Sequence, residues 1–345
     1  MENLKLNYDN AFEYYCIKNC YLQILRYYGV KQPEFYIETI IDWKWFKDSQ
    51  APYGYRLTTG TPLSGFLFPY DNKLLLGDSS FQSAEEIWME NEASIKNGIP
   101  VVVAVDVFFL PYTPYFQKKH AFHSLIITGI CPNGNVEIID YYPPWFYRGE
   151  IERSLIEHAR NSDNSQGGLL GGIPINYMWS TITVNGWNAE SKDLVTATVN
   201  QSLNKYFLGS NNIEWCSGCY VLEKLLALIM SSAREPLKAR GKFLEDLYQK
   251  LYFVVTRKRL HLWYISLCEK VIPSPLWSNC SEILERSIRC FKTALNLCIK
   301  FSIRPSETLY DSIITQFIQC KNCENQFFYN VFQIKSIILD RENKN

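Results

Sequence analysis

Residues 12–30 read FEYYCIKNCYLQILRYYGV, and this stretch decides the fold of the first half of the chain. From Cys16 onward the apolar residues recur at helical spacing, and Gly29 can end a helix in the left-handed conformation. The pattern predicts a helix with Cys16 in its first turn and Cys20 one turn further along the same face. Unpaired N–H groups and partial positive charge at a helix N-terminus lower the pKa of a thiol there. Cys16 is therefore a candidate nucleophile, although cysteines that only fill a core are commoner.

A histidine and an aspartate further along the chain are candidate partners for this cysteine. His123 opens the apolar run 125–127, and after the turn CPNGN the predicted strand VEIID ends at Asp140. A hairpin brings the start of one strand beside the end of the next, where a carboxylate can hold an imidazole for proton transfer. With Cys16, the two residues form a candidate Cys-His-Asp triad.

Two features of these residues resemble known enzymes. Cys16 with the continuation CYLQILRYYG, followed in order by His123 and Asp140, resembles papain-like folds of the bacteriocin-leader peptidase type. The segment VDVFFLPY, which ends at Tyr112, resembles the VD-x-x-x-LPY segment of the butirosin-biosynthesis acyltransferase family within that fold. The resemblance covers roughly the first half of the chain. It implies an α+β fold with a papain-like cysteine catalytic domain, in which a helix packs on an antiparallel sheet.

The resemblance also suggests a group that binds the oxyanion. In papain-like enzymes a side-chain amide a few residues before the nucleophile acts there, together with the backbone N–H of the cysteine. Asn10 stands where the resembling peptidases carry a glutamine, and its shorter side chain departs from their pattern. An ordinary turn residue is an equally good interpretation of Asn10.

Asp106 and His120 are candidate substrate-binding residues. Asp106 ends a predicted buried strand, where its side chain either contacts substrate or, as is commoner, accepts hydrogen bonds from backbone amides. His120 follows Lys118 and Lys119, and these three residues either meet a phosphopantetheine arm or form a solvated charged loop. His123 is preferred over His120 as the base because it directly precedes an apolar strand, whereas His120 follows two lysines.

Other segments of the first half carry local signals. Residues 83–98, SAEEIWMENEASIKNG, combine a serine N-cap, a following glutamate and a glycine stop, which predicts a helix. Residues 175–187, INYMWSTITVNGW, are typical of a strand. The sequence YYPPWFYRG after Asp140 is interpreted as a stiff aromatic turn. The aromatic segment 35–70, rich in glycine and proline, is interpreted as short strands and turns that wall a cleft.

The second half of the chain has a different, helical character. Five of its segments are apolar at i, i+3, i+4 and i+7 and are separated by prolines. We therefore predict a catalytic domain over residues 1–190 and an α-helical domain over residues 191–345. The helical segments are SLNKYFL, GCYVLEKLLALIMSSA, KFLEDLYQKLYFVVTRKRLHLWYISLCEKVI, SEILERSIRCFKTALNLCIKFS and SETLYDSIITQFIQC.

Composition excludes several classes of protein. The 345 residues carry a formal net charge of zero, so no global field attracts nucleic acid or an anionic membrane. With 47% hydrophobic residues the chain can bury a core, yet no uncharged run is long enough to span a membrane. The start MENLKLNYDN has no features of a secretory signal, and the 11 cysteines then favour free thiols in a reducing compartment. We expect a cytoplasmic protein.

Two cysteine pairs have the spacing of metal ligands. Cys216 and Cys219 form one CxxC, and Cys320 and Cys323 form the other. Small zinc modules hold such pairs close in sequence, whereas about a hundred residues of predicted helix separate these two. We interpret them as packing thiols and expect no metal. The only cofactor-like group that the resemblance implies is the phosphopantetheine arm of a donor carrier protein.

Three functions are compatible with these features. The first is an acyltransferase of specialised peptide- or polyketide-type metabolism, in which Cys16 takes an acyl group from an acyl or peptidyl carrier protein and passes it to a small-molecule amine. The second is a hydrolase that cuts a peptide or thioester with the same triad. The third is a papain-like binding module without activity. The intact triad disfavours the third function. The LPY segment and the large helical domain favour transfer, because a transferase must shelter its thioester from water.

Overall fold

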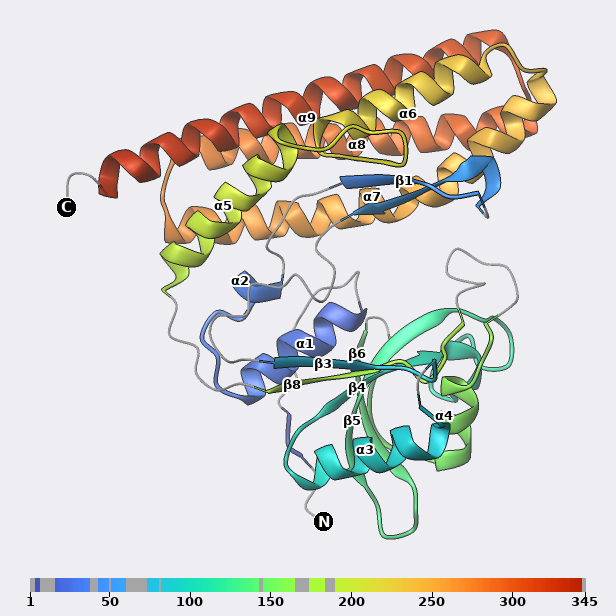
Figure 1. Cartoon of the computed structure of the whole chain (residues 1–345), viewed down its shortest axis with the longest axis vertical. Helices are drawn as coiled ribbons and strands as arrows, with labels where there is room; N and C mark the ends of the chain where they lie inside the picture. Colours follow the sequence, from blue (N-terminus) through green and yellow to red (C-terminus); the bar gives the residue numbers. More distant parts are fainter. Residues whose placement is uncertain are drawn as a thin grey trace. The chain divides into compact units, whose positions relative to one another are not determined.

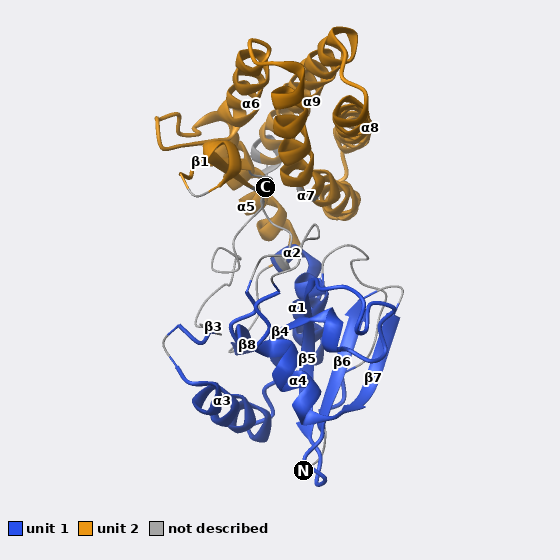
Figure 2. Cartoon of the chain, turned by 90° about the vertical axis from the view of Figure 1, so that its right-hand side faces the viewer, with its two compact units in different colours: residues 1–37, 68–188 blue, residues 38–67, 189–345 orange. Residues whose placement is uncertain are grey.

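The computed structural model of the chain describes residues 4–6, 16–37, 43–49, 51–59, 73–80, 82–142, 145–164, 174–183 and 190–342. The chain forms two compact units (Figure 2). Unit 1 comprises Met1–Ile37 and Phe68–Asn188, and unit 2 comprises Glu38–Leu67 and Ala189–Asn345. Unit 1 mixes helices with an antiparallel sheet, and unit 2 contains the C-terminal helices, which confirms the predicted α+β class with a helical second half.

The described strands of unit 1 form one antiparallel sheet in the order β3-β8-β4-β5-β6-β7 (Figure 1). The middle strand β4 is buried along its whole length, as its apolar sequence predicts. Strands β5 and β6 form the predicted hairpin, closed by a hydrogen bond from Cys131 N to Asn135 O. The strands are β3 (Lys73–Gly77), β4 (Val101–Asp106), β5 (Phe122–Ile130), β6 (Val136–Tyr142), β7 (Trp145–Ile151) and β8 (Trp179–Thr183).

The described residues of the aromatic segment after Asp140 lie in strands, so their interpretation as a turn was wrong. Residues Trp145–Ile151 form β7, which pairs with β6 over its full length. Half-buried and exposed residues alternate along most of β7. This alternation of half-buried and exposed side chains suits a half-solvated edge strand.

Helices cover both faces of this sheet. Tyr21 of α1 hydrogen-bonds to Ser180, which pairs with Val102 and shares its face. Ile87 of α3 and Ile156 of α4 join the core that lies on the opposite face, because alternate strand residues point to opposite sides. The helices are α1 (Cys16–Tyr27), the short α2 (Glu34–Ile37), α3 (Ala84–Lys96) and α4 (Arg153–Arg160).

The ends of α1 and α3 follow their sequence signals. Gly29 takes a φ of 75° just after α1, the left-handed conformation that glycine adopts at low cost. Ser83 caps α3 by accepting a hydrogen bond from Glu86 N, while the Glu86 carboxylate accepts one from Ser83 N. Both helix predictions are confirmed.

Long helices dominate unit 2 (Figure 1). Helix α9 continues to Glu342, well beyond the predicted end at Cys320, because its apolar spacing persists through Phe327 and Ile334, which are buried. Helix α8 begins with Pro275 after the N-cap Ser274. The helices are α5 (Ser191–Phe207), α6 (Cys219–Ser232), α7 (Leu237–Val271), α8 (Pro275–Ile303) and α9 (Glu307–Glu342).

A three-stranded antiparallel sheet, in the order β2-β1-β9, completes unit 2. Its strands are β1 (Trp43–Lys47), β2 (Tyr55–Thr59) and β9 (Trp215–Ser217). Strands β1 and β2 come from the segment 35–70 that the sequence assigned to the catalytic domain. Trp45 instead pairs with Cys216, and the Trp43 ring lies 5.6 Å from that of Phe291 in α8, so this hairpin belongs to unit 2. The second boundary, between Asn188 and Ala189, lies beside the predicted one at residue 190.

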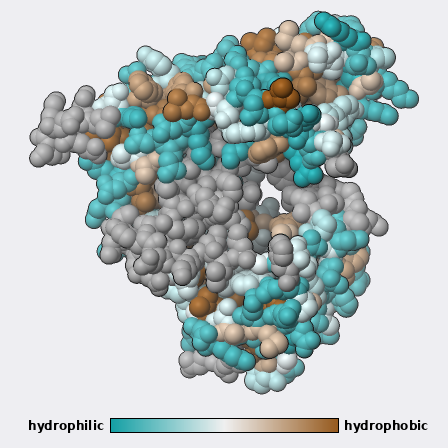
Figure 3. All heavy atoms as spheres, in the orientation of Figure 1, coloured by the Kyte–Doolittle hydropathy of each residue, from teal (hydrophilic) through white to brown (hydrophobic). Residues whose placement is uncertain are grey.

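The described residues contain neither a transmembrane helix nor a metal cluster. None of the described helices combines the length and apolar character of a membrane-crossing segment. No group of three or more His, Cys, Asp or Glu side chains in the described ranges is arranged to hold a metal ion, and the cysteines of both CxxC pairs are free thiols. On the face in Figure 3, hydrophilic side chains cover most of the described surface, with hydrophobic ones in small groups among them.

Candidate active site

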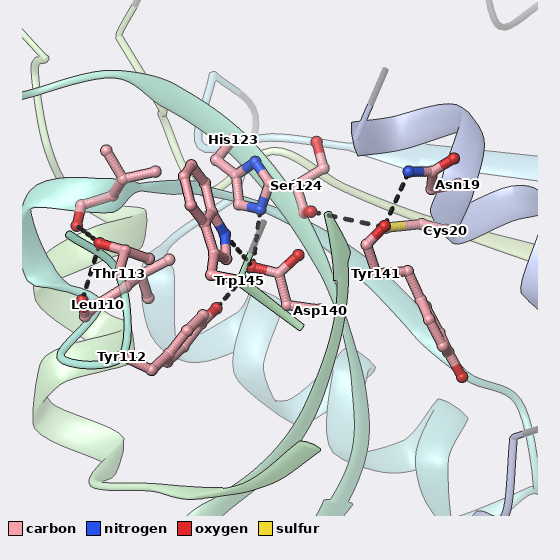
Figure 4. A network of polar contacts seen from close by, with 11 residues as sticks. Asn19, Cys20, Leu110, Tyr112, Thr113, His123, Ser124, Asp140, Tyr141 and Trp145 are labelled. Carbon is pink, nitrogen blue, oxygen red and sulfur yellow. Dashed lines mark hydrogen bonds and ion pairs between the residues drawn. The ribbon is translucent and has the colours of Figure 1, made fainter. Parts of the chain in front are cut away.

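Cys16 is the first residue of α1, and buried contacts fix this helix on the sheet. The Asn19 side chain donates a hydrogen bond to Tyr141 O over 2.8 Å (Figure 4). The Cys20 thiol donates to Ser124 O over 3.6 Å. Because Ser124 and Tyr141 directly follow His123 and Asp140 in the chain, these contacts dock α1 beside the predicted base and carboxylate.

His123 and Asp140 form a buried pair. His123 Nε2 lies 2.8 Å from Asp140 Oδ2, and the side chains are 4% and 1% exposed. Since a carboxylate only accepts hydrogen bonds, Nε2 carries the proton of this contact and Nδ1 is the ring nitrogen left for Cys16. The rings of Tyr142 and Trp145 pack edge-on against the imidazole, with centroid distances of 5.2 and 5.8 Å.

The electrostatics of the site favour a charged pair between Cys16 and His123. Burial raises the pKa of the Cys16 thiol, but the charge and hydrogen bond of His123 outweigh it, so the pKa lies below the ordinary 9.0. Burial lowers the pKa of His123, but the charge of Asp140, the charge of Cys16 and hydrogen bonds with both raise it to about 10. A thiolate beside an imidazolium is the state that makes a cysteine nucleophilic.

Cys20 has the opposite environment. Burial, with the charges of Cys16 and Asp140, raises the pKa of the Cys20 thiol well above its ordinary value. Cys20 is 1% exposed, and its thiol donates a hydrogen bond to a backbone carbonyl. Of the two cysteines on this face of α1, only Cys16 has the environment of a nucleophile.

Two residues to which the sequence gave no role also contact the carboxylate of Asp140. The Tyr112 hydroxyl donates to Oδ2 over 2.7 Å, and Trp145 Nε1 donates to the same oxygen over 3.2 Å (Figure 4). Tyr112 is the tyrosine of the LPY segment, so the motif itself was the available signal. Trp145 lay in the segment interpreted as a turn.

Asp106 and His120 form a second pair of carboxylate and imidazole. Asp106 Oδ1 accepts hydrogen bonds from Phe108 N and Ala121 N, the backbone role that its strand-end position suggested. Oδ2 lies 2.6 Å from His120 Nδ1 and accepts a hydrogen bond from Ser162, which sequence reasoning missed. These contacts close the loop between β4 and β5.

The loop that carries His120 is only partly solvated. Lys118 and Lys119 are exposed, but the His120 side chain is 20% exposed and its ring stacks on Phe108 at 4.2 Å. Substrate binding by Asp106 and His120 stays a prediction.

Asn10, the candidate oxyanion donor, lies outside the described residues. The N–H groups in the first turn of α1 have no partner within that helix, so they are alternative donors to an oxyanion.

Comparison with known protein families gives a match to part of the chain. Residues 75–141 match the family described as butirosin biosynthesis protein H, N-terminal. The match runs from β3 to the end of β6 and includes Tyr112, His123 and Asp140, but it covers only about a fifth of the chain and not Cys16. No curated protein matches the sequence.

Proposed function

We propose that this protein is a papain-like cysteine acyltransferase that acts in the biosynthesis of a butirosin-type or related specialised metabolite. The observation that carries the proposal is the pairing of Cys16 with His123. The imidazole of His123 hydrogen-bonds to Asp140 through its other ring nitrogen. The match to butirosin biosynthesis protein H over the segment with His123 and Asp140 supports the biosynthetic role.

In the first step the Cys16 thiolate attacks the carbonyl of an acyl thioester on a carrier protein. The new bond joins Cys16 Sγ to the acyl carbon, and the bond to the phosphopantetheine sulfur breaks. His123 gives its Nδ1 proton to the leaving thiolate, so the arm departs as a thiol. One thioester replaces another, which makes this step close to neutral in free energy.

In the second step an amine attacks the acyl group on Cys16. His123, now neutral, accepts a proton from the amine, while Asp140 stabilises the imidazolium that forms. The carbon–sulfur bond breaks, an amide leaves, and the Cys16 thiolate beside protonated His123 is restored. N–H donors of the first turn of α1 are suitable for the oxyanion of both steps.

The test is intact-protein mass spectrometry with small acyl thioesters and with acyl carrier proteins. We expect the mass of the wild-type chain to rise by that of the acyl group and the adduct to map to Cys16. Cys16→Ala should give no adduct, whereas the matched variant Cys20→Ala should still be acylated. Adding a panel of amines should then discharge the adduct to an amide.

Two other outcomes would contradict the proposal and favour a different function. Release of free acid at the same rate with and without any amine would indicate a hydrolase with the same three residues. An absence of adduct with every donor, in a protein whose Cys16 is still readily alkylated, would favour a binding module.

A further inference from the structure

Three hydrogen-bond donors converge on one oxygen of the Asp140 carboxylate. His123 Nε2, the Tyr112 hydroxyl and Trp145 Nε1 all contact Oδ2, at 2.8, 2.7 and 3.2 Å (Figure 4). The other oxygen, Oδ1, is buried and has no hydrogen-bond partner among the described residues. The position of the carboxylate that orients His123 therefore depends on the donors at Oδ2.

Tyr112 makes the shortest of these contacts. A hydroxyl that donates to a carboxylate forms a charge-assisted hydrogen bond, which is stronger than one between neutral groups. Burial and the charge of Asp140 keep the pKa of Tyr112 well above its ordinary value, so the hydroxyl stays protonated. Trp145, at 3.2 Å, is the more distant donor.

The surrounding chain fixes the Tyr112 ring. Thr113 donates through its hydroxyl to Val107 O and Leu110 O, and its N–H also donates to Leu110 O, which closes the turn that carries Tyr112. The ring stacks on Tyr147 of β7 with centroids 4.1 Å apart and planes within 8°. The hydroxyl is therefore held against Asp140 before any substrate binds.

We propose that Tyr112 is a positioning residue whose hydroxyl fixes the Asp140 carboxylate and, through it, the orientation of His123 toward Cys16. The inference rests on the proposed function of this site, since it concerns the same three residues. It assigns a physical role to the tyrosine of the LPY segment. Without the Tyr112 hydroxyl, Asp140 Oδ2 keeps two donors, His123 Nε2 and Trp145 Nε1. The orientation of the carboxylate, and with it that of the His123 ring, is then less constrained.

The rate at which Cys16 is alkylated at low pH depends on the orientation of His123 toward Cys16. His123 carries its proton throughout the acid range, so the pH at which Cys16 becomes a thiolate depends on how well the imidazolium is placed. The groups that act on the pKa values of Cys16 and His123 are Asp140, the Ser124 side chain, which lowers the pKa of Cys16, and each other; Cys16 in turn raises the pKa of the Cys20 thiol. Tyr112 acts only through Asp140.

The experiment measures the rate of Cys16 alkylation by iodoacetamide against pH in the full-length chain. In Tyr112→Phe we expect the midpoint to move to higher pH by about half a unit or more, which is roughly a threefold loss of rate on the acid limb. The matched control is Tyr147→Phe, which keeps the stacked ring and loses a hydroxyl that donates to Glu150 O. Its midpoint should stay at the wild-type value.

A double-mutant cycle separates positioning from general packing. In an Asp140→Ala background the acceptor of the Tyr112 hydrogen bond is absent, so adding Tyr112→Phe should move the midpoint no further. Superimposable profiles for wild type and Tyr112→Phe would overturn the proposal, as would an equal shift in Tyr147→Phe. Phenylalanine keeps the ring and its stacking, and thermal unfolding checks that each variant is folded.

Alkylation needs no substrate, so this test is independent of the acylation experiment. A shifted midpoint in a protein that transfers no acyl group would support Tyr112 as a positioning residue and reject the acyltransferase. With an active donor, Tyr112→Phe should lower kcat with little change in KM, because the hydroxyl donates to Asp140 and its role is to position His123.

Discussion

His123 Nε2 lies 2.8 Å from Asp140 Oδ2 across a single hairpin, and this contact leaves Nδ1 for Cys16. The hairpin is a local structure, so the base and its carboxylate are placed by neighbouring strands. The nucleophile comes from a helix that precedes them by about a hundred residues.

Cys16 should react with a thiol probe faster than any other cysteine, and faster than Cys20 by about tenfold or more, since only the thiolate is nucleophilic. The pKa of Cys16 is lowered by His123, whereas that of Cys20 is raised by burial. Limited alkylation followed by peptide mass spectrometry gives the order of labelling. First labelling of Cys20, with activity retained in Cys16→Ala, would show that the nucleophile is misassigned.

His123→Ala should lower kcat by roughly a thousandfold or more, because it removes the proton carrier of both steps. His120→Ala should mainly change KM, because His120 bonds to Asp106 and not to the carboxylate of Asp140. Steady-state kinetics of the two variants with one thioester donor provides the comparison. Equal losses of kcat would contradict the choice of His123 as the base.

Asp140→Asn should leave a small residual rate. An asparagine keeps the shape of the side chain but loses the charge that stabilises protonated His123, so the ion pair with Cys16 weakens. The pKa of His123 should fall below the wild-type value of about 10, since the charge of Asp140 is a main cause that raises it. The pH dependence of Cys16 alkylation and of kcat measures both effects.

The pH dependence of kcat/KM should be bell-shaped. Activity needs a Cys16 thiolate and a protonated His123 in the free enzyme. As pH falls through the lowered pKa of Cys16, the thiolate gains a proton and activity is lost. As pH rises through about 10, His123 loses its proton and activity is lost again. A profile with an alkaline limb near 6.5, the ordinary pKa of histidine, would contradict the pairing.

A buried ion pair in unit 2 gives a prediction about stability. Lys258 of α7 and Glu324 of α9 form an ion pair with both side chains 2% exposed, and Ser287 donates to the same carboxylate over 2.9 Å. Lys258→Met should destabilise the helices by about 3–5 kcal/mol, because the glutamate charge is left buried. Lys258→Met with Glu324→Met should cost far less. Denaturant unfolding followed by circular dichroism compares the variants, and equal losses in both would rule out this explanation.

Local sequence patterns predicted the helix from Cys16, the capping box at Ser83 and the hairpin that joins His123 to Asp140. Each depends on residues close in the chain, where spacing and turn chemistry act directly. The same patterns failed for β7, because a short aromatic run after two prolines suits either a turn or an edge strand. The end of α9 was missed although its apolar spacing continues.

The sequence by itself therefore determined several local elements, among them the helix from Cys16 and the hairpin, and which residues could make a Cys-His-Asp site. Only the tertiary structure decided that strands β1 and β2 pair beside β9, that Ser162 bonds to Asp106, and that Tyr112 and Trp145 converge on Asp140. These contacts depend on sheet order and on how loops close over strand ends. A local pattern carries no signal for either, because their energy comes from residues that meet only after the chain has folded.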